Sequence, residues 1–345
     1  MTLLRRLKVQ NFRTHEKMDI PIDDGVTLIT GSNGSGKTSL IEAIYIALRG
    51  SSFRGVDMDI VRHTSEWWRV DLLSDDKTTR SVMFDSSKST GRKRFIIDSK
   101  TTYRLPQKHK WPVVLFEPDD LRLLHGSPAR RRMFIDRFIG QLDPLYTTVL
   151  HKYERALKQR NNLLKKQYFA DDELFVWDLL LSEYGAEIIQ KRVNYIKILQ
   201  SELSDTYNSI AHTDDEVIIR YSHDITRQKL LSDYHEHHAK DKLLGNTSVG
   251  PHRHDVEFIF SSMPAISVAS RGEIRSIVLA LKFLEVKIIE KVLDMKPIIL
   301  LDDVYSELDE TRRHKLVDSI SNYQVIITNT HGLPEAKTYN HIELS

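Results

Sequence analysis

The sequence of 345 residues contains no cysteine, which excludes disulfide bonds and thiolate metal sites. It has no stretch approaching the roughly 18 apolar residues that a membrane-spanning helix needs. Residues 1–8 also lack an apolar core of signal-peptide length. We therefore expect a cytoplasmic protein with no membrane partner. Hydrophobic residues make up 40% and charged residues 28%, as in an ordinary globular protein, and the length allows two domains and a large core.

A glycine-rich segment stands between an apolar run at 26–30 and an apolar-rich run at 39–48, and it reads as a loop joining a strand to a helix. In such a loop, glycines let successive backbone N–H groups converge on phosphate oxygens, and the positive end of the helix strengthens the field. Lys37 can reach the β and γ phosphates of a nucleotide, and the Thr38 hydroxyl can ligate Mg²⁺. A helix-opening loop that merely matches the pattern is the alternative. The predicted nucleotide-binding residues are Gly31, Ser32, Asn33, Gly34, Ser35, Gly36, Lys37, Thr38 and Ser39.

A second segment, Pro297-Ile-Ile-Leu-Leu-Asp302-Asp303, complements this loop. Four apolar residues after a proline are typical of a strand buried on both faces. Its two carboxylates follow at the edge where open α/β sheets bind ligands. We expect Asp302 to hold Mg²⁺, directly or through water, and Asp303 to orient the attacking water. An acidic turn after a core strand is the alternative.

The net charge of +2 conceals an uneven distribution. Between Lys88 and Lys166 there are nineteen Lys and Arg against seven Asp and Glu, so this segment carries +12 and the remainder −10. A protein that binds a polyanion needs such a local excess, although many charged runs are simply solvated faces. Arg130, Arg131 and Arg132 are the predicted DNA contacts.

The order of predicted elements divides the chain into three segments. Residues 1–125 contain several strands, among them an antiparallel meander at 68–72, 81–84 and 94–98. Residues 126–244 have a helical period, and those from 189 to 210 carry apolar residues at sevenfold spacing, a seam that we interpret as packing within a helical bundle. Residues 245–345 return to strands. The two ends therefore predict one domain, interrupted by a helical arm.

Two further features concern anions and metals. Ser270 and Gly272 come just before a predicted helix at 274–293, which makes a second anion site, so two chains are expected to close on one nucleotide. His331 follows a core strand and can reach a γ-phosphate, although a lone histidine is more often structural. The cluster at 235–238 lacks the spacing of a metal-binding histidine motif, so we favour no metal site there.

Several motifs follow one another in a fixed order: Asn11-Phe12-Arg13, the phosphate loop, Ser52-Phe53-Arg54, Gly250-Pro-His-Arg253, Ser270-x-Gly-Glu273, Leu301 to Asp309 and Ile327-Thr328. In this order they resemble the RecF family, bacterial recombination-mediator ATPases of the ABC type that are related to SMC proteins. The resemblance covers nearly the whole chain and is most specific at its two ends.

The resemblance implies an α/β fold, an ABC-type P-loop ATPase head with an inserted α-helical arm. It implies that ATP closes a homodimer over duplex or gapped DNA near single-strand/double-strand junctions, that slow hydrolysis releases it, and that a RecR-type protein is its partner. Ser270 and Gly272 correspond to the signature motif that contacts the γ-phosphate of the opposite subunit, and residues 306–309 to the D-loop. Arg13 lies in a loop that approaches the nucleotide in related heads. His331 matches the switch histidine approximately, and residues 117–120 are the neighbourhood of the glutamine loop.

The sequence also departs from the family. Arg271 and Glu273 stand where the family usually has glutamine, and Arg271 adds positive charge beside the expected γ-phosphate. Asp303 replaces the glutamate of fast transporter ATPases, which favours slow hydrolysis. A transporter subunit is disfavoured because Ser270 lies 233 residues after Lys37. An SMC-like structural or accessory ATPase that does not load recombinase remains the alternative.

Overall fold

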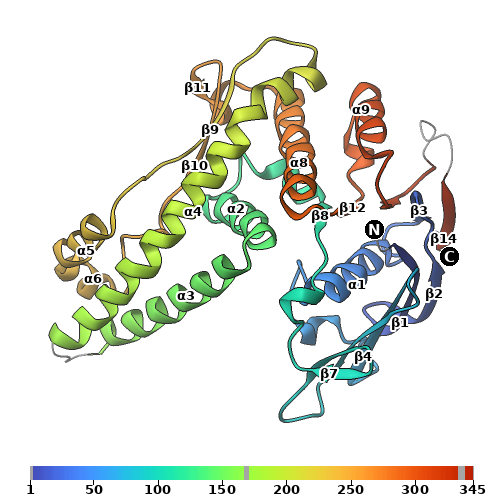
Figure 1. Cartoon of the computed structure of the whole chain (residues 1–345), viewed down its shortest axis with the longest axis horizontal. Helices are drawn as coiled ribbons and strands as arrows, with labels where there is room; N and C mark the ends of the chain where they lie inside the picture. The colour runs from blue at the N-terminus through green and yellow to red at the C-terminus, as the bar shows by residue number, and fades with distance from the viewer. Residues whose placement is uncertain (1–2, 167–170, 333–338, 345) are drawn as a thin grey trace. The chain divides into compact units, whose positions relative to one another are not determined.

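The computed structural model describes residues 3–166, 171–332 and 339–344 (Figure 1). The chain forms two compact units. Unit 1 contains residues 1–120 and 285–345, and unit 2 contains residues 121–284. The sequence predicted boundaries after residues 125 and 244. Residues 245–284 lie in unit 2 because β10 (Val256–Phe260) pairs with β9 (Val217–Tyr221).

Unit 1 contains a parallel sheet of five strands built from both ends of the chain. Their order is β14 (Asn340–Leu344), β3 (Val26–Gly31), β13 (Val325–Asn329), β12 (Ile298–Asp302) and β8 (Val113–Phe116). Every residue of β8, β12 and β13 is buried. This matches the apolar runs of the sequence, because parallel strands are covered on both faces.

An antiparallel sheet of six strands is the second layer of unit 1. Its order is β2 (His15–Pro21), β1 (Leu4–Phe12), β4 (Trp67–Ser74), β5 (Thr79–Asp85), β6 (Lys93–Ile97) and β7 (Lys100–Thr102). The predicted meander is confirmed by the pairing of β4 with β5 and of β5 with β6. Of the motif Asn11-Phe12-Arg13, the first two residues belong to β1, and Phe12 is fully buried.

Helix α1 (Lys37–Arg49) joins the two layers. It contacts strands of both sheets, and its residues 39–48 are buried in the main hydrophobic core. The phosphate loop is thereby anchored at the end of a helix that cannot shift without disturbing that core. The remaining elements of unit 1 are η1 (Asp57–Ile60), η2 (Gln107–His109), η4 (Tyr305–Glu307) and α9 (Glu310–Ile320); η3 (Pro118–Arg122) and α8 (Arg271–Leu293) cross the boundary between the units.

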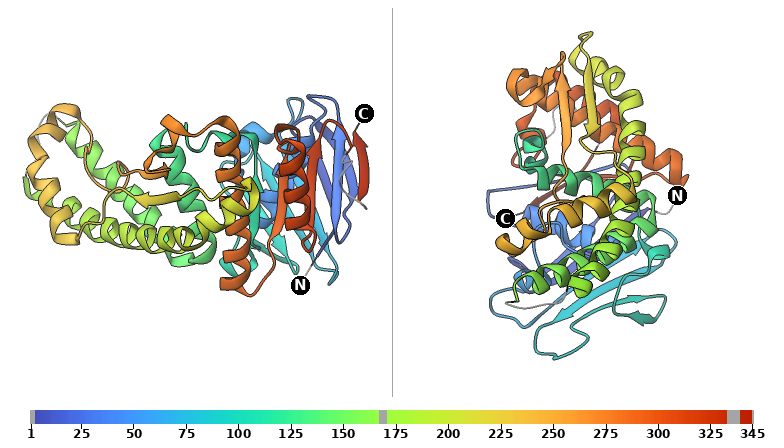
Figure 2. Two further views of the ribbon diagram at one scale, coloured as in Figure 1. Left: turned by 90° about the horizontal axis from the view of Figure 1, so that it is seen from above. Right: turned by 90° about the vertical axis from the view of Figure 1, so that its left-hand side faces the viewer.

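Unit 2 consists of helices and a small antiparallel sheet. Its helices are α2 (Pro128–Leu142), α3 (Pro144–Leu164), α4 (Asp171–Ala211), α5 (Arg227–Glu236), α6 (His238–Leu244), α7 (Ala265–Val268) and most of α8, and its sheet has the order β11 (Met263–Pro264), β10, β9. Helices α3 and α4 pack side by side (Figure 2). Among the helices described, none combines the length and apolar content that a bilayer crossing requires.

The apolar seam of α4 packs inside unit 2. Ile189, Ile196, Leu203 and Ile210 are all buried. The same helix contacts β9, where Gln200 Oε1 accepts a hydrogen bond from Ile219 N at 2.6 Å. The interpretation of the seam as bundle packing is therefore confirmed.

Candidate nucleotide site

The phosphate loop follows β3 and closes tightly against the turn between β1 and β2. Gly36 has φ of 93°, in the left-handed region that favours glycine. A Cβ at this position would lie 2.3 Å from His15 Nε2 and 2.6 Å from Thr14 Oγ1. His15 Nε2 is also 3.0 Å from the carbonyl oxygen of Gly36. A side chain at residue 36 would therefore strain the backbone and displace the side chains of the neighbouring turn.

The Lys37 ammonium lies over the loop that precedes it. Its Nζ donates hydrogen bonds to the carbonyl oxygens of Gly31 at 2.7 Å and Ser32 at 3.0 Å. The side chain is 7% exposed, so its charge is held in a poorly hydrated position. An anion bound by the loop would meet this charge with little water between them, which strengthens the attraction.

The predicted magnesium ligands are brought into contact. Thr38, at the start of α1, donates from Oγ1 to Asp302 Oδ1 at 2.9 Å, although 264 residues separate them. Thr328, on the strand between β3 and β12, donates to the same oxygen at 2.8 Å. A hydroxyl and a carboxylate in this arrangement are oxygen ligands of the kind that Mg²⁺ takes.

Asp303 directly follows β12 and is held in an unusual backbone conformation. Its φ is 52°, and its N–H donates to Thr328, at 3.1 Å to the carbonyl and 3.0 Å to Oγ1. Burial raises the pKa of the Asp303 carboxyl. The charge of Lys37 opposes this rise, and the charge of Asp302 adds to it. A carboxylate with a raised pKa at a strand end is suited to accept a proton or orient water.

Two buried polar atoms near this edge have no hydrogen-bond partner among the residues that the structure describes. They are Ser35 Oγ, in the phosphate loop, and Asn329 Oδ1, at the end of β13 beside β3. Buried polar atoms are almost always paired in proteins, so each orphan needs an explanation. A ligand seated in the loop would supply the missing partner for Ser35.

Arg13 is already engaged within unit 1. Its guanidinium donates from Nε and Nη2 to the carboxylate of Glu42, at 2.9 and 2.8 Å, and from Nη1 to the Asp59 carbonyl at 2.7 Å. Glu42 lies on α1 and is fully buried. The hydrogen bonds to Glu42 raise the pKa of Arg13. Arg13 therefore braces α1, and its approach to a nucleotide stays a prediction.

The signature segment lies in unit 2, at the start of α8. The hydroxyl of Ser270 accepts from Glu273 N at 3.3 Å, and the Glu273 carboxylate accepts from Ser270 N at 2.6 Å. This reciprocal pair is a capping box, which satisfies two backbone donors at the helix start. Arg271 is exposed, and Gly272 lies within the first turn of α8.

The remaining predicted positions lie in loops or in short 3₁₀ helices. His331 is exposed two residues after β13, and its carbonyl accepts from Asn329 Nδ2 at 3.0 Å. Ser306, in the predicted D-loop, donates to the Asp303 carbonyl at 2.9 Å. The expected glutamine-loop neighbourhood falls at the start of η3, where Glu117 N donates to Asp120 Oδ2 at 3.0 Å.

The three arginines predicted to contact DNA lie near the start of α2. Arg131 pairs with Asp255 at 2.7 Å and also donates to the carbonyls of Leu124 and Gly126. Arg132 donates to the His254 carbonyl at 2.7 Å. All three are only partly exposed. Arg131 and Arg132 thus hold unit 2 together, and a contact between this trio and DNA stays a prediction.

Sequence reasoning missed Thr328 and Asn329 as members of the site. Thr328 links Asp302 and Asp303, and Asn329 carries one of the two orphan oxygens. The available signal was that Thr328 and Asn329 end an apolar run. Parallel strands end at one edge of their sheet, so these two residues lie at the same edge as Asp302 and Asp303. His15 and Glu42 gave no such signal, because their partners lie elsewhere in the sequence.

Comparison with known proteins gives one family. Residues 3–338 match the model described as the RecF/RecN/SMC N terminal domain. The DNA replication and repair protein RecF of Streptococcus suis is 36% identical over 356 residues, which cover 99% of this chain and 97% of that protein. The corresponding RecF of Agathobacter rectalis is 34% identical over 339 residues, covering 96% and 93%.

Solved structures agree with this relationship. The structure of the recombination mediator protein RecF-ATP in the RecFOR pathway has a TM-score of 0.86 at 30% identity, covering 96% of this chain and 93% of that one. The SMC head bound to the C-terminal winged-helix domain of ScpA has a TM-score of 0.56 at 15% identity, covering 99% and 93%. The second likeness concerns the fold alone, that of an ABC-type ATPase head.

Proposed function

Because the chain belongs to the RecF family of DNA replication and repair proteins, we propose that it is an ATP-dependent DNA clamp of recombinational repair. ATP binding closes a homodimer over duplex or gapped DNA near single-strand/double-strand junctions. Slow hydrolysis reopens it. The clamp promotes loading of recombinase at gaps, and a RecR-type mediator protein is its partner.

The observation that carries this proposal is the conjunction of the phosphate loop with the carboxylate edge of β12. Ser35 Oγ is buried and unpaired, and Lys37 Nζ is held over the loop by two carbonyls. These groups fit a polyphosphate, because the loop offers one orphan hydroxyl, a poorly hydrated cation and the positive end of α1.

The donor set also fits a magnesium ion. Thr38 Oγ1 and Asp302 Oδ1 lie 2.9 Å apart and would both turn to Mg²⁺ when it is bound. When bound there, the ion would neutralise charge on the phosphates of the nucleotide. Thr328 keeps Asp302 in position through its own hydrogen bond at 2.8 Å.

Asp303 is the residue that we assign to hydrolysis. Its backbone N–H is fixed by Thr328, so its carboxylate projects from a rigid point beside Lys37. In this position it orients a water and accepts a proton from it. Aspartate is one methylene shorter than the glutamate of fast transporter ATPases, which favours slow turnover and a long-lived clamp.

Ser270 and Gly272 are the reason that we expect two chains to bind one nucleotide together. They belong to unit 2, and the signature segment opens a helix of 23 residues whose positive end attracts anions. We propose that this end meets the γ-phosphate of ATP held by a second copy. An SMC-like structural ATPase would share this dimer but would not require a junction in its DNA.

The test is equilibrium DNA binding with and without ATP, on gapped, duplex and single-stranded oligonucleotides. We expect ATP to tighten binding of the wild type to duplex and gapped DNA, and Lys37→Ala and Ser270→Ala to abolish that gain. Lys17→Ala removes an exposed charge from β2 of unit 1 and serves as the matched control. DNA affinity that is absent or indifferent to ATP would refute the clamp.

A preference for gapped over blunt duplex DNA separates the two candidate functions. The proposed mediator binds most tightly where single and double strands meet. Equal affinity for both substrates would favour the SMC-like accessory role instead. A pull-down with purified RecR-type protein, with and without ATP, tests the partner.

A further inference from the structure

The segment Gly250–Arg253 is one of the motifs of the sequence, yet it takes no part in the nucleotide site. Gly250 has φ of 115°, and a Cβ there would lie 2.5 Å from Tyr234 Oη and 2.7 Å from Tyr153 Oη. The backbone of this turn is therefore pressed against two buried tyrosines. Such close packing fixes the direction in which the next residues leave the turn.

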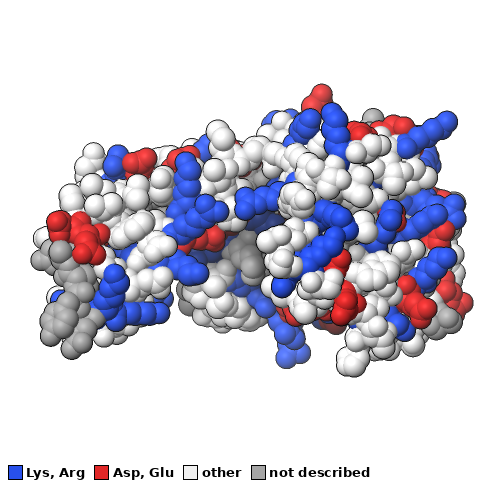
Figure 3. Space-filling view, turned by 90° about the horizontal axis from the view of Figure 1, so that it is seen from below, with Lys and Arg blue, Asp and Glu red and all other residues white. Residues whose placement is uncertain are grey.

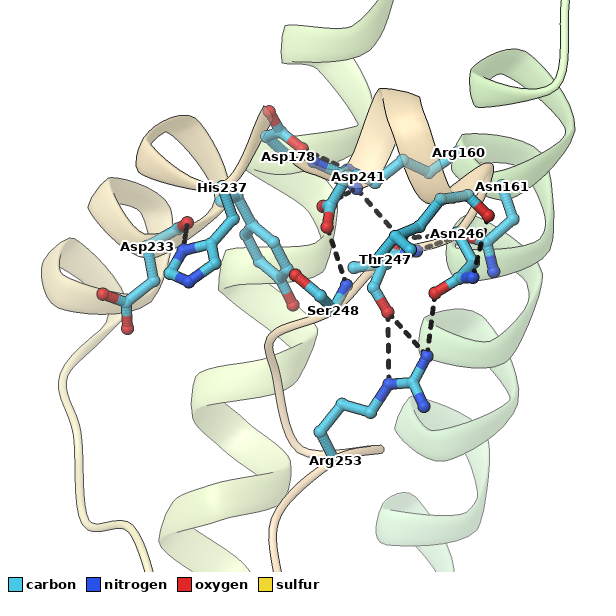
Figure 4. Close-up of polar contacts among 12 residues, drawn as sticks. Arg160, Asn161, Asp178, Asp233, His237, Asp241, Asn246, Thr247, Ser248 and Arg253 are labelled. Atoms are coloured by element: carbon cyan, nitrogen blue, oxygen red, sulfur yellow. Dashed lines mark hydrogen bonds and ion pairs between the residues drawn. The ribbon is translucent and has the colours of Figure 1, made fainter. Parts of the chain in front are cut away.

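The turn is also locked by hydrogen bonds to a single carbonyl (Figure 4). Burial lowers the pKa of His252 to about 4, so the ring is neutral near pH 7. His252 Nδ1 lies 2.7 Å from Tyr153 Oη, and Nε2 lies 3.1 Å from the carbonyl of Thr247. Arg253 donates to the same carbonyl from Nε at 3.2 Å and Nη2 at 3.0 Å, and Nη2 also reaches Asn246 Oδ1 at 3.0 Å.

Arg253 is nonetheless exposed. The bonds to Thr247 and Asn246 use two of its three nitrogens, and no described residue accepts a hydrogen bond from Nη1 or forms an ion pair with it. An arginine held in one orientation loses less side-chain freedom when it binds an anion than a freely moving one. Arg253 is thus a positioned cation at the surface.

Buried contacts tie this turn to α3. Arg160, fully buried on α3, donates from Nη1 to Thr247 Oγ1 at 2.9 Å. Asn161 Oδ1 accepts from Thr247 N at 2.8 Å and from Thr247 Oγ1 at 2.7 Å. Figure 4 shows Thr247 between these α3 residues and Arg253. Arg253 is therefore attached to α3 at the level of Asn161.

The exposed side of α3 at this level is cationic. Lys158 and Lys165 lie three residues before and four residues after Asn161, which puts all three on one helix face. A Cβ at Gly245, next to the turn, would lie 3.5 Å from Lys165 Cγ. Further round the same exposed side are Lys152, Arg155 and Lys166. Figure 3 views the side on which α3 lies in Figure 1 and shows Lys and Arg along it.

Three of these cations form no ion pair with a described residue, unlike others in unit 2. Within residues 3–166, 171–332 and 339–344, no carboxylate forms an ion pair with Lys158, Lys165 or Arg253. By contrast, Lys229 pairs with Asp233 at 2.7 Å, and Arg220 with Glu257 at 2.6 Å. The acid on the exposed side of α3, Glu154, contacts His151 at 3.2 Å.

We propose that Arg253, Lys158 and Lys165 form a phosphate-binding surface of unit 2 that contacts the backbone of duplex DNA. This inference rests on the proposed DNA-binding function. Its residues differ from Arg130, Arg131 and Arg132, which the sequence predicted as DNA contacts. From Lys152 to its last residue, Leu164, α3 extends about 18 Å, roughly the length of five base pairs, and Lys165 and Lys166 follow directly. The exposed positions along this stretch are polar or charged, whereas a protein interface needs an apolar centre, so we favour DNA over an acidic protein.

The experiment measures affinity for a fluorescent duplex, with ATP, across a series of salt concentrations. The variant Lys158→Gln/Lys165→Gln removes two charges from side chains without hydrogen bonds among the described residues. We expect about tenfold or more loss of affinity, and a slope of log affinity against log salt smaller by about two, because each lost phosphate contact removes about 0.9. Arg253→Ala should reduce the slope by about one.

Controls separate this surface from folding and from the proposed function. Lys197→Gln removes an exposed charge from α4 and should leave both affinity and slope unchanged. Arg253→Lys keeps the charge, so it should keep the slope but lower the affinity. If the wild type binds DNA and the double variant matches it in affinity and slope, this surface is wrong and the clamp survives. If the wild type binds no DNA, both proposals fail.

Discussion

Replacing Arg160 by methionine is expected to destabilise unit 2 strongly. Arg160 is fully buried, and its Nε donates to Asp178 at 2.6 Å while Nη1 donates to Asp241 at 2.7 Å. Asp241 is also fully buried, and Asp178 is 5% exposed. Methionine fills a similar volume but leaves both carboxylates without their cation.

The magnitude follows from what remains after the substitution. Removing one partner of a buried ion pair costs about 3–5 kcal/mol. Asp241 keeps a hydrogen bond from Ser248 N at 2.9 Å, which limits the loss, so we expect about 4 kcal/mol. For a unit of this size, about 2–4 °C are lost per kcal/mol, so the melting temperature of unit 2 should fall by about 8–16 °C.

The pH dependence gives a second, independent signature. Burial raises the pKa of Asp178 from its ordinary value of 3.8, and Arg160 opposes that rise. Without Arg160 the pKa of Asp178 rises further, so the folded variant binds more protons than the unfolded chain above pH 3.8. Its stability therefore increases as the pH falls, and the deficit relative to wild type should shrink from pH 8 to pH 5.

Trp177 provides the assay, because it is the only tryptophan in residues 121–284 and precedes Asp178. Urea unfolding followed by the fluorescence difference between each protein and its Trp177→Phe counterpart reports on unit 2. Arg155→Met, on the exposed side of α3, is the matched control and should cost less than about 0.5 kcal/mol. A cost below about 1 kcal/mol for Arg160→Met, or one that does not change with pH, would refute the buried-charge explanation.

Three further variants test the nucleotide site. Asp303→Asn should lower ATP hydrolysis by about 100-fold or more while ATP binding persists, as measured by phosphate release and by equilibrium binding. It should also raise the melting temperature at pH 7, because a carboxylate whose pKa burial raises destabilises the folded state above that pKa; a lower melting temperature would contradict this. Gly36→Ala should destabilise the fold by about 1 kcal/mol more than Gly34→Ala, because both share the left-handed conformation but only residue 36 is crowded by the side chains of Thr14 and His15, and thermal unfolding of both variants measures the difference. Ser270→Asp should preserve stability but abolish ATP-dependent dimerisation, measured by light scattering, and unimpaired dimerisation would contradict the assigned role.

Local patterns were sufficient to predict the elements that surround the phosphate loop. The apolar runs before residues 31 and 302 are continuous because parallel strands are covered on both faces. The alternation at 68–72 and 81–84 reflects strands with two different faces. The 41-residue helix α4 kept its sevenfold apolar spacing because it packs along most of its length. In each case the apolar pattern lies in the same strand or helix that it predicts.

Partnerships between distant residues could not be predicted in this way. Arg13 meets Glu42 across 29 residues, and Arg131 meets Asp255 across 124. A count of charges gives the excess of Lys and Arg in residues 88–166. It does not show which of these cations already form an ion pair with a carboxylate. The arginine run at 130–132 is the most conspicuous basic feature of the sequence, yet Arg131 forms an internal ion pair, whereas the unpaired cations of α3 are dispersed along a helix.

The capping box at α8 explains why Ser270→Asp separates two roles of one hydroxyl. As acceptor for Glu273 N, Ser270 Oγ stabilises the helix start, and its own proton remains available to another acceptor. Aspartate caps a helix as well as serine does, so the first role survives. The other proposed role of Ser270 is its contact with the γ-phosphate of ATP held by a second copy. Aspartate offers no proton and adds a negative charge, so it repels that phosphate. Ser270→Ala loses both roles and costs about 1 kcal/mol of helix stability. Only the aspartate variant therefore attributes a loss of dimerisation to the phosphate contact rather than to a frayed helix.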